Sequence, residues 1–215
     1  AEQRLATVGQ MAGEVAHELN TPLANILGYA QLAQSHTAAA GVREPLDVIV
    51  EQARRAGQIV GDMLTVARAP ALTNQAVDLA ELTRAFSRLV APLARRQGIL
   101  VEIRDAGPAP AWADASRIEQ ILFNLVTNAT QAGARHIALI PAAGMLDVID
   151  DGSGVLPGIR DRLFEPFATS KAQGQGTGLG LAICRRLAEE MDGSLALAAS
   201  APGYTCFRLT LPTAP

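Results

Sequence analysis

The amino-acid sequence predicts an α+β protein with two parts: an N-terminal helical hairpin, which forms a dimeric four-helix bundle, and an α/β sandwich domain. Apolar residues recur at helical spacing through residues 2–36 and again from about 45 to 68. Residues 69–74 interrupt this pattern, and strand-like runs alternate with helical runs from Ala76 onward. We expect the hairpin at residues 1–69, a linker at 70–76 and the second domain at 77–215.

The first helix has an apolar seam with the heptad spacing of bundles and coiled coils. The seam residues are Leu5, Val8, Ala12, Val15, Leu19, Ile26 and Ala30. A weak turn signal around Gly41 follows. The second helix begins near Pro45, where the missing N–H of proline would be unpaired anyway. Because a lone hairpin cannot cover both of its apolar faces, we expect a homodimer.

Helical runs in the second domain alternate with short apolar runs that are typical of strands. The expected helices are 79–96, 116–132 and 179–191, and the expected strands are 99–103, 136–140, 146–149, 195–198 and 206–211. This mixture indicates helices on one face of a sheet. Only residues 141–144 separate two of the strands, which predicts a tight hairpin. The loop between Gly154 and Gly178 is long and rich in Gly, Gln and charge, as functional lids are.

The composition excludes several classes of protein. The 215 residues carry a formal net charge of -3, whereas nucleic-acid binders usually present a basic face, so we expect no nucleic-acid partner. Cys184 and Cys206 have no metal or CxxC spacing, which fits a reducing cytoplasm. No apolar run approaches the ~20 residues that span a bilayer, so we expect no membrane contact by this segment. The chain starts inside a helical pattern, and a longer parent protein could be anchored at the inner membrane.

His17 is predicted to face away from the apolar seam of the first helix. In the heptad of the seam it falls at f, directly away from the partner helices, and Thr21 lies four residues on, on the same face. Pro22 cannot donate to the carbonyl of Glu18, so the helix should bend beside the histidine. Taken alone, His17 is more simply explained as a solvated surface residue.

Two segments of the second domain have spacings that suit a nucleotide. Asn124 and Asn128 lie four residues apart on one helix face, and an amide oxygen is a suitable ligand for Mg²⁺. They could equally be surface polar groups. Asp150 ends an apolar strand directly before a Gly-Ser-Gly turn, so its carboxylate could accept a hydrogen bond from the amino group of adenine. Asp-Gly turns are common for conformational reasons, so this signal is weak alone.

A third segment, Gly174-Gln-Gly176-Thr177-Gly178-Leu179-Gly180, precedes the last predicted helix. Glycines before a helix N-terminus expose backbone N–H groups and a favourable dipole to phosphate. The run could instead be an ordinary flexible loop. It fits a dinucleotide fingerprint poorly, because no strand directly precedes it.

The order of these segments resembles the ATP-binding domain of histidine kinases, part of an ATPase superfamily with gyrase, Hsp90 and MutL. The Asn helix, the Asp-Gly turn, Phe164-Glu-Pro-Phe167 and the glycine run match its N, G1, F and G2 boxes. Upstream, the string AHELNTPL at residues 16–23 resembles the H-box of the same kinases, whose histidine accepts phosphate. The resemblance spans nearly the whole chain. It implies the core of a two-component sensor histidine kinase that uses ATP and Mg²⁺.

The resemblance also implies a role for each matching residue. Asn128 would ligate Mg²⁺, and Asn124 would support the nucleotide. Asp150 would recognise adenine, with Gly152 and Gly154 shaping that wall. The phosphate-binding and lid residues would be Gly176, Thr177, Gly178, Leu179, Gly180, Phe164 and Phe167.

The resemblance does not decide the roles of two residues of the nucleotide site. The family often has a basic residue three positions after the metal ligand, and this chain has Gln131 there. Phosphate neutralisation would then rest more on Mg²⁺ and on lid residues such as Lys171. Lys171 could equally be a solvated charge on the lid.

The implied reaction transfers a phosphoryl group from ATP to a ring nitrogen of His17, with Glu18 as general base or as the group that orients the imidazole. The phosphate would then pass to an aspartate on the receiver domain of a response regulator. Thr21, with Glu18, also matches kinases that dephosphorylate their regulator. His36 and His136 have no such surroundings, and we interpret them as surface or packing residues.

Two other functions fit part of the pattern. An ATPase of the same superfamily could act as a conformational clamp, and its ATP turnover would be insensitive to His17→Ala. A dimeric adaptor with an inactive nucleotide site is the non-enzymatic alternative. The presence of Asn128, Asp150 and the glycines speaks against the adaptor, although Gln131 leaves a small opening for it.

Overall fold

The structure, a computed structural model, describes residues 23–35, 42, 45–50, 53, 56–57, 72–104, 107–166, 168 and 178–213. The chain divides into two compact units, Ala1–Pro70 and Ala71–Pro215. Within those described ranges, no helix has both the length and the apolar character that crossing a membrane requires.

The described residues of the first unit are helical at 23–35 and at 45–50. Gln34 Nε2 donates a hydrogen bond to Asp47 Oδ1, so the two helical stretches lie against each other. Ala30, Val50 and Ala53 are buried. Large apolar side chains that stay exposed in the single chain are Ile26, Tyr29, Leu32, Val48 and Ile49. The described helical stretches therefore leave apolar surface exposed. Ile26, a residue of the predicted seam, is part of this exposed surface.

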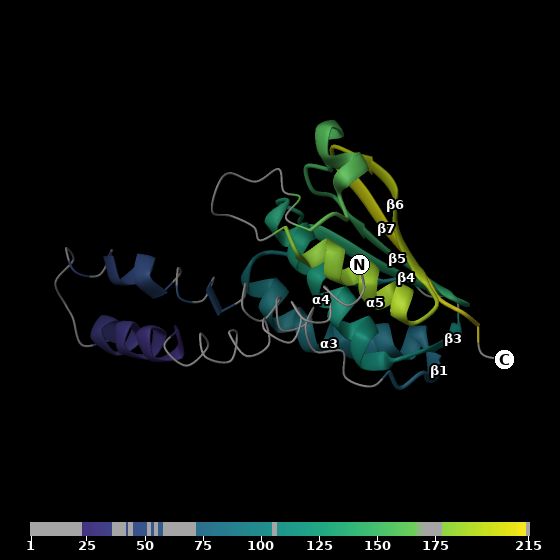
Figure 1. The fold of residues 1–215 in the computed structure, drawn as a ribbon, viewed down its shortest axis with the longest axis horizontal. Helices are drawn as coiled ribbons and strands as arrows, with labels where there is room; N and C mark the ends of the chain where they lie inside the picture. The colour runs from purple at the N-terminus through teal and green to yellow at the C-terminus, as the bar shows by residue number, and fades with distance from the viewer. Residues whose placement is uncertain are drawn as a thin grey trace, which may run out of the picture. The chain divides into compact units, whose positions relative to one another are not determined.

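In the described part of the second unit, helices cover one face of a five-stranded sheet (Figure 1). The helices are α3 (Leu79–Arg96), α4 (Ala115–Gln131) and α5 (Gly180–Glu190), and the strands of this sheet are β2 (Leu100–Ile103), β4 (His136–Ala142), β5 (Met145–Asp150), β6 (Ser194–Ala201) and β7 (Tyr204–Thr210). The strand order is β2-β4-β5-β7-β6, with β2 parallel to β4 and all other neighbours antiparallel. The predicted α+β class is confirmed. The tight hairpin is also present, because Ala142 pairs with Met145.

A second, two-stranded sheet was not predicted. It consists of β1 (Gln75–Asp78) and β3 (Pro110–Ala113), which run antiparallel. β3 reads Pro-Ala-Trp-Ala, and proline and alanine are poor strand formers, so its sequence gives little signal. The Asp78 carboxylate ends β1 and caps α3, accepting hydrogen bonds from the backbone N–H groups of Ala80 and Ala109 at 2.9 Å each. This strand pair therefore ties the start of the unit to α3.

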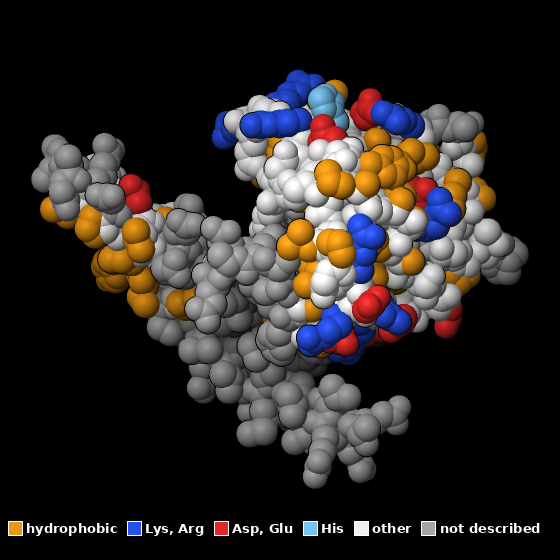
Figure 2. Space-filling view, turned by 90° about the horizontal axis from the view of Figure 1, so that it is seen from above, with side chains coloured by type: hydrophobic (Ala, Val, Ile, Leu, Met, Phe, Trp, Pro, Cys, Tyr) orange, Lys and Arg blue, Asp and Glu red, His pale blue; other side chains and the backbone are white. Residues whose placement is uncertain are grey.

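The surface of the second unit carries both signs of charge. Figure 2 shows Lys and Arg side chains mixed with Asp and Glu side chains and with hydrophobic patches on the face seen from above. Among the described ion pairs, Arg208 binds Asp147 through two contacts of 2.7 Å across β7 and β5.

Helix α4 is the central packing element of the helical layer. Its side chains at spacings of three and four residues are buried: Ile118, Ile121, Leu122, Leu125 and Ala129. Its N-terminus is capped by Asp114, whose carboxylate accepts from the backbone N–H of Ser116 at 3.0 Å. An aspartate cap is favoured because it satisfies an otherwise unpaired amide and complements the helix dipole.

We expect Leu122→Ala to lower the free energy of unfolding of the second unit by about 2–5 kcal/mol, because it leaves a cavity in a closed core. The neighbouring Phe123 is 52% exposed, so Phe123→Ala is a matched control with an expected loss below ~1 kcal/mol. Trp112 is the only tryptophan of the chain and lies on β3, so its fluorescence in urea reports on this unit. Equal losses in the two variants would contradict the packing described.

Candidate functional site

The structure describes some of the predicted site residues and not others. Those outside the described residues are His17, Glu18, Thr21, Phe167, Lys171, Gly176 and Thr177. Those within them are Asn124, Asn128, Asp150, Gly152, Gly154, Gly178, Leu179 and Gly180. The second group comes from three places in the second unit: helix α4, the turn after β5, and the start of α5.

Asp150, the last residue of β5, is a buried carboxylate with only 6% of its surface exposed. It lies opposite Thr205 of β7. Its Oδ1 accepts a hydrogen bond from the backbone N–H of Gly152 at 2.9 Å. Burial raises the pKa of Asp150, and the negative charge of Asp151 acts in the same direction, while the hydrogen bonds from Gly152 and Thr205 lower it. The carboxylate is thus held in one orientation at the end of a central strand.

The glycines after Asp150 are required by the protein's own backbone. A Cβ at Gly152 would lie 2.8 Å from Asp150 Oδ1 and 2.9 Å from the Ala132 side chain. Gly154 has φ +79°, and a Cβ there would lie 2.8 Å from the Ala201 carbonyl oxygen. The family resemblance implies that these glycines shape the wall of the adenine site. The structure adds a different reason, which is close contact between the turn and its neighbours.

The turn after β5 is bonded to the end of helix α4. The backbone N–H of Ser153 donates to the carbonyl of Ala132, the C-cap of α4, at 3.0 Å. Asn128 lies one helical turn before Ala132, and Asn124 one turn earlier, and both are half-buried. The structure therefore brings the C-terminal end of the Asn helix and the Asp150 turn together.

Helix α5 begins without a side-chain cap. Gly178 has φ +68°, and Leu179, the N-cap residue, is buried and makes no capping side-chain hydrogen bond. No acidic residue lies in the first turn. Within the part of the chain that the structure describes, no side chain caps α5 and its first turn has no acidic residue, an arrangement that suits a phosphate at the positive end of the helix dipole. Helix α5 packs against α4.

Phe164, predicted as a lid anchor, is held from two sides. Its ring meets that of Phe207 on β7 edge to face, with 6.5 Å between ring centroids. The guanidinium of Arg185 on α5 lies over the same ring, 5.7 Å from its centroid. The segment leading into the lid is therefore fixed to both α5 and the sheet.

A polar contact beside the site was not predicted from the sequence. His136, interpreted above as a surface or packing residue, places Nδ1 2.9 Å from Asp151 Oδ2. The other oxygen of Asp151 accepts from the backbone N–H groups of His136 at 2.9 Å and Arg135 at 2.6 Å. These contacts, led by the His136 backbone N–H, lower the pKa of Asp151 to about 2. The carboxylate next to Asp150 thus ties the turn to the start of β4, a pairing that only the strand register reveals.

Two families match the chain. Residues 7–72 match the His Kinase A (phospho-acceptor) domain, and residues 113–215 match the histidine kinase-, DNA gyrase B-, and HSP90-like ATPase family. The chain is 34% identical to the C4-dicarboxylate transport sensor protein DctS of Rhodobacter capsulatus, over 97% of the chain and 34% of that protein. It is 32% identical to the sensor histidine kinase ZraS of Escherichia coli K12, over 98% of the chain and 47% of that protein. The chain thus spans less than half the length of these relatives.

Solved structures that include a histidine kinase are also similar to this chain. Full-length ShkA in complex with AMPPNP superimposes with a TM-score of 0.76 at 31% identity, covering 96% of this chain and 46% of that one. The histidine kinase ThkA in complex with the response regulator protein TrrA gives a TM-score of 0.69 at 25% identity, covering 100% of this chain and 64% of that one.

We expect Asp150→Asn to make the second unit at least as stable as the wild type at pH 7. The pKa of Asp150 is raised in the folded chain, so folding favours the protonated carboxyl group. Its contribution to the free energy of unfolding is complete below pH ~4 and is lost as the pH rises through the raised pKa. Asparagine can still accept from Gly152 and bond Thr205 without carrying a buried charge. Unfolding in urea would be followed by Trp112 fluorescence between pH 4 and 8. The free energy of unfolding of the variant should increase relative to that of the wild type as the pH rises.

Asp151→Asn should have the opposite effect, because the pKa of Asp151 is lowered to about 2. The contribution of the Asp151 carboxylate to the free energy of unfolding is present above pH ~4 and is lost as the pH falls toward 2. We expect a loss of about 1 kcal/mol at pH 7, kept small by solvent screening since the side chain is 37% exposed. Finding both variants equally destabilised at pH 7 would contradict the assigned environments.

Proposed function

The chain belongs to the histidine kinases, and we propose that it is the core of a two-component sensor kinase that transfers the γ-phosphoryl group of ATP to its own His17. The observation that carries this proposal is the joined geometry of the second unit. A buried carboxylate at the end of β5 precedes a turn that is bonded to the C-terminal end of the Asn helix, and this helix packs against α5. The proposal places this core in the cytoplasm, where ATP and a response regulator are both available.

Each described site residue has a part in nucleotide binding under this proposal. Asp150 accepts a hydrogen bond from the adenine amino group, which its fixed orientation favours. The amides around Gly178, Leu179 and Gly180 bind phosphate oxygens at the start of α5. Asn124 supports the nucleotide from the half-buried flank of α4. Gly176, Thr177, Lys171 and Phe167 complete the phosphate contacts and the lid.

Asn128 is the proposed Mg²⁺ ligand. Among the described residues, no three His, Cys, Asp or Glu side chains are grouped as a metal site. A metal held by one amide oxygen takes its other ligands from phosphate oxygens and water, which is the usual arrangement for Mg²⁺ in phosphoryl-transfer sites. When bound, the ion would neutralise charge on the β- and γ-phosphates.

The proposed reaction forms a phosphoramidate. A ring nitrogen of His17 attacks the γ-phosphorus, the bond between that phosphorus and the β–γ bridging oxygen breaks, and ADP leaves. Glu18 accepts the ring proton or orients the imidazole, because a neutral imidazole is the competent nucleophile. Protein catalysis is then mainly the positioning of two reactants and the neutralisation of their charge.

We propose two protein partners. A homodimer would cover the apolar side chains of the described helical residues, including Ile26, Tyr29 and Leu32. A response regulator would receive the phosphoryl group on an aspartate of its receiver domain. The similarity to ThkA, solved with the response regulator protein TrrA, supports this partner. Thr21, with Glu18, is the proposed pair for dephosphorylating the regulator.

The alternatives predict different behaviour. A conformational clamp hydrolyses ATP without forming phosphohistidine, and a dimeric adaptor neither hydrolyses ATP nor becomes phosphorylated. The match of residues 7–72 to the phospho-acceptor domain favours the kinase over both.

We expect the purified chain to become labelled when it is incubated with γ-labelled ATP and Mg²⁺. The label should be labile in acid and stable in alkali, as a phosphoramidate is, and absent in His17→Gln. His36→Gln is the matched control and should leave labelling within about twofold of the wild type. Asp150→Asn should abolish labelling while the protein stays folded.

Absence of label in the wild type would disprove the kinase. ATP turnover that persists unchanged in His17→Gln would identify the clamp. Dephosphorylation needs a separate assay, with the phosphorylated regulator as substrate and Thr21→Ala as the variant.

A further inference from the structure

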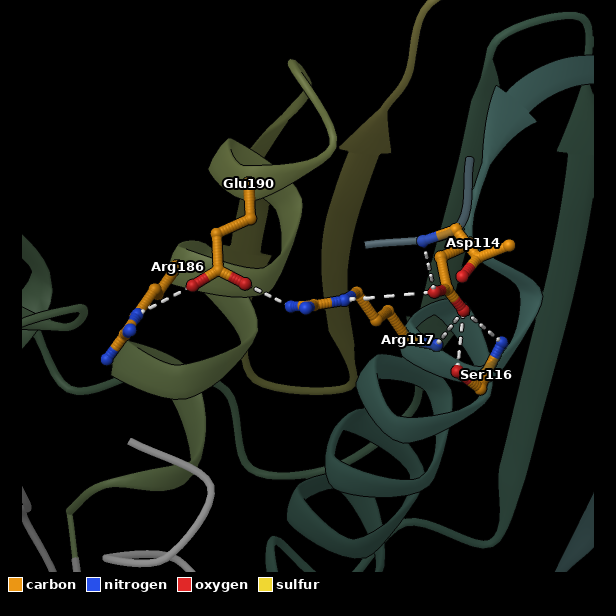
Figure 3. Close-up of polar contacts among 6 residues, drawn as sticks. Asp114, Ser116, Arg117, Arg186 and Glu190 are labelled. Carbon is orange, nitrogen blue, oxygen red and sulfur yellow. Dashed lines mark hydrogen bonds and ion pairs between the residues drawn. The ribbon is translucent and has the colours of Figure 1, made fainter. Parts of the chain in front are cut away.

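An ion pair between a buried arginine and a half-buried glutamate joins helices α4 and α5 at the end away from the candidate site (Figure 3). Arg117, in the first turn of α4, is only 6% exposed. Its Nη1 binds Glu190 Oε2 at the last residue of α5, and its Nε lies 4.0 Å from Asp114 Oδ2. Glu190 also accepts from Arg186 Nε at 2.8 Å, but Arg186 lies on the same helix. Arg117–Glu190 therefore links the two helices, whereas Arg186–Glu190 does not.

The two helices run antiparallel. Arg117 contacts Glu190, and one turn further along α4 the carbonyl of Ile121 lies 4.0 Å from Cys184 Sγ on α5. As the residue number rises on α4 it falls on α5. The C-terminal end of α4 and the N-terminal end of α5 are therefore on the same side, at the nucleotide site.

The ion pair sets how far each helix extends toward the site. Asn128 lies eleven residues after Arg117, about 16 Å along the axis at 1.5 Å per residue. Gly180 lies ten residues before Glu190, about 15 Å along its axis. Because the ion pair joins the two helices at the end away from the site, the metal ligand of α4 and the phosphate-binding turn of α5 lie at nearly the same distance from it along the helix axes.

Burial of a guanidinium is costly, and an apolar pair of similar volume often stabilises a core as well or better. Unlike an apolar pair, an ion pair holds its two charged groups in a defined geometry. Among the described residues, the other buried charged side chains are Asp147, which pairs with Arg208 across the sheet, and Asp150 in the site. Arg117 is the buried charge that connects the two nucleotide-binding helices.

We propose that Arg117 is a positioning residue that aligns α4 with α5, so that the groups binding metal and phosphate face one nucleotide. This inference rests on the proposed function and adds a residue to it. Adenine recognition does not depend on this alignment, because Asp150 is oriented by Gly152 and by Thr205 of the sheet. Loss of Arg117 should therefore weaken binding of the phosphates and spare binding of the base.

Arg117→Met tests the proposal in the full chain. The variant keeps a long apolar side chain, and Glu190 keeps Arg186 as its partner, so folding is expected and is checked by the melting temperature. Affinities for Mg·ADP and for adenosine are measured side by side, by calorimetry and by NMR titration. We expect Mg·ADP affinity to fall about tenfold, the scale seen when partners that orient ligands are removed, with adenosine affinity changed less than about twofold.

Arg186→Met is the matched control, since it removes an arginine from the same carboxylate without unlinking the helices. It should change neither affinity more than about twofold. Glu190→Gln should reproduce the selective loss of Mg·ADP affinity. Equal losses for both ligands in Arg117→Met would show a merely structural role, and unchanged Mg·ADP affinity would show no role. Either result overturns the proposal. Failure of the wild type to bind Mg·ADP would instead disprove the proposed function.

Discussion

The second unit depends on the burial of the apolar face of α4 against the sheet. Ile118, Ile121 and Leu122 are completely buried, so the rotation of this helix about its axis is set by packing. Asn124 and Asn128 then lie on the flank that packing leaves half-buried. The same constraint presents Ala132 to the turn that carries Gly152. A helix held by its core can therefore place polar groups that make little contribution to stability.

Asp150 is a buried carboxylate whose negative charge is unfavourable in its surroundings. A carboxylate in a buried position is disfavoured in its charged form, which the raised pKa expresses. Two hydrogen bonds orient it and offset part of that cost. Asp151, one residue on, has the reverse environment, because three donors stabilise its charge. Adjacent residues of identical type thus differ in role, one suited to a ligand and one suited to anchoring the turn.

The sequence was enough to predict the α+β class, the helices of the second unit and the strands of its main sheet, because periodicity reports directly on burial. It did not predict β1 and β3, whose four-residue strands contain proline and alanine. It also missed the contacts of His136 with Asp151 and of Arg117 with Glu190. These residues lie far apart in the chain, and only strand register and helix packing bring them together. The roles of His17, Glu18 and Thr21 stay predictions, since they lie outside the described residues.

The position of β7 has a consequence for synthesis on the ribosome. This strand follows all the others in chain order, yet it inserts between β5 and β6. Until it emerges, β5 has an open edge and Asp150 has no Thr205 opposite it. Phe164 likewise has no Phe207 to meet. A nascent chain therefore contains the whole of the first unit, Ala1–Pro70, well before Asp150 can acquire Thr205 opposite it, so the two units become complete at different times during synthesis.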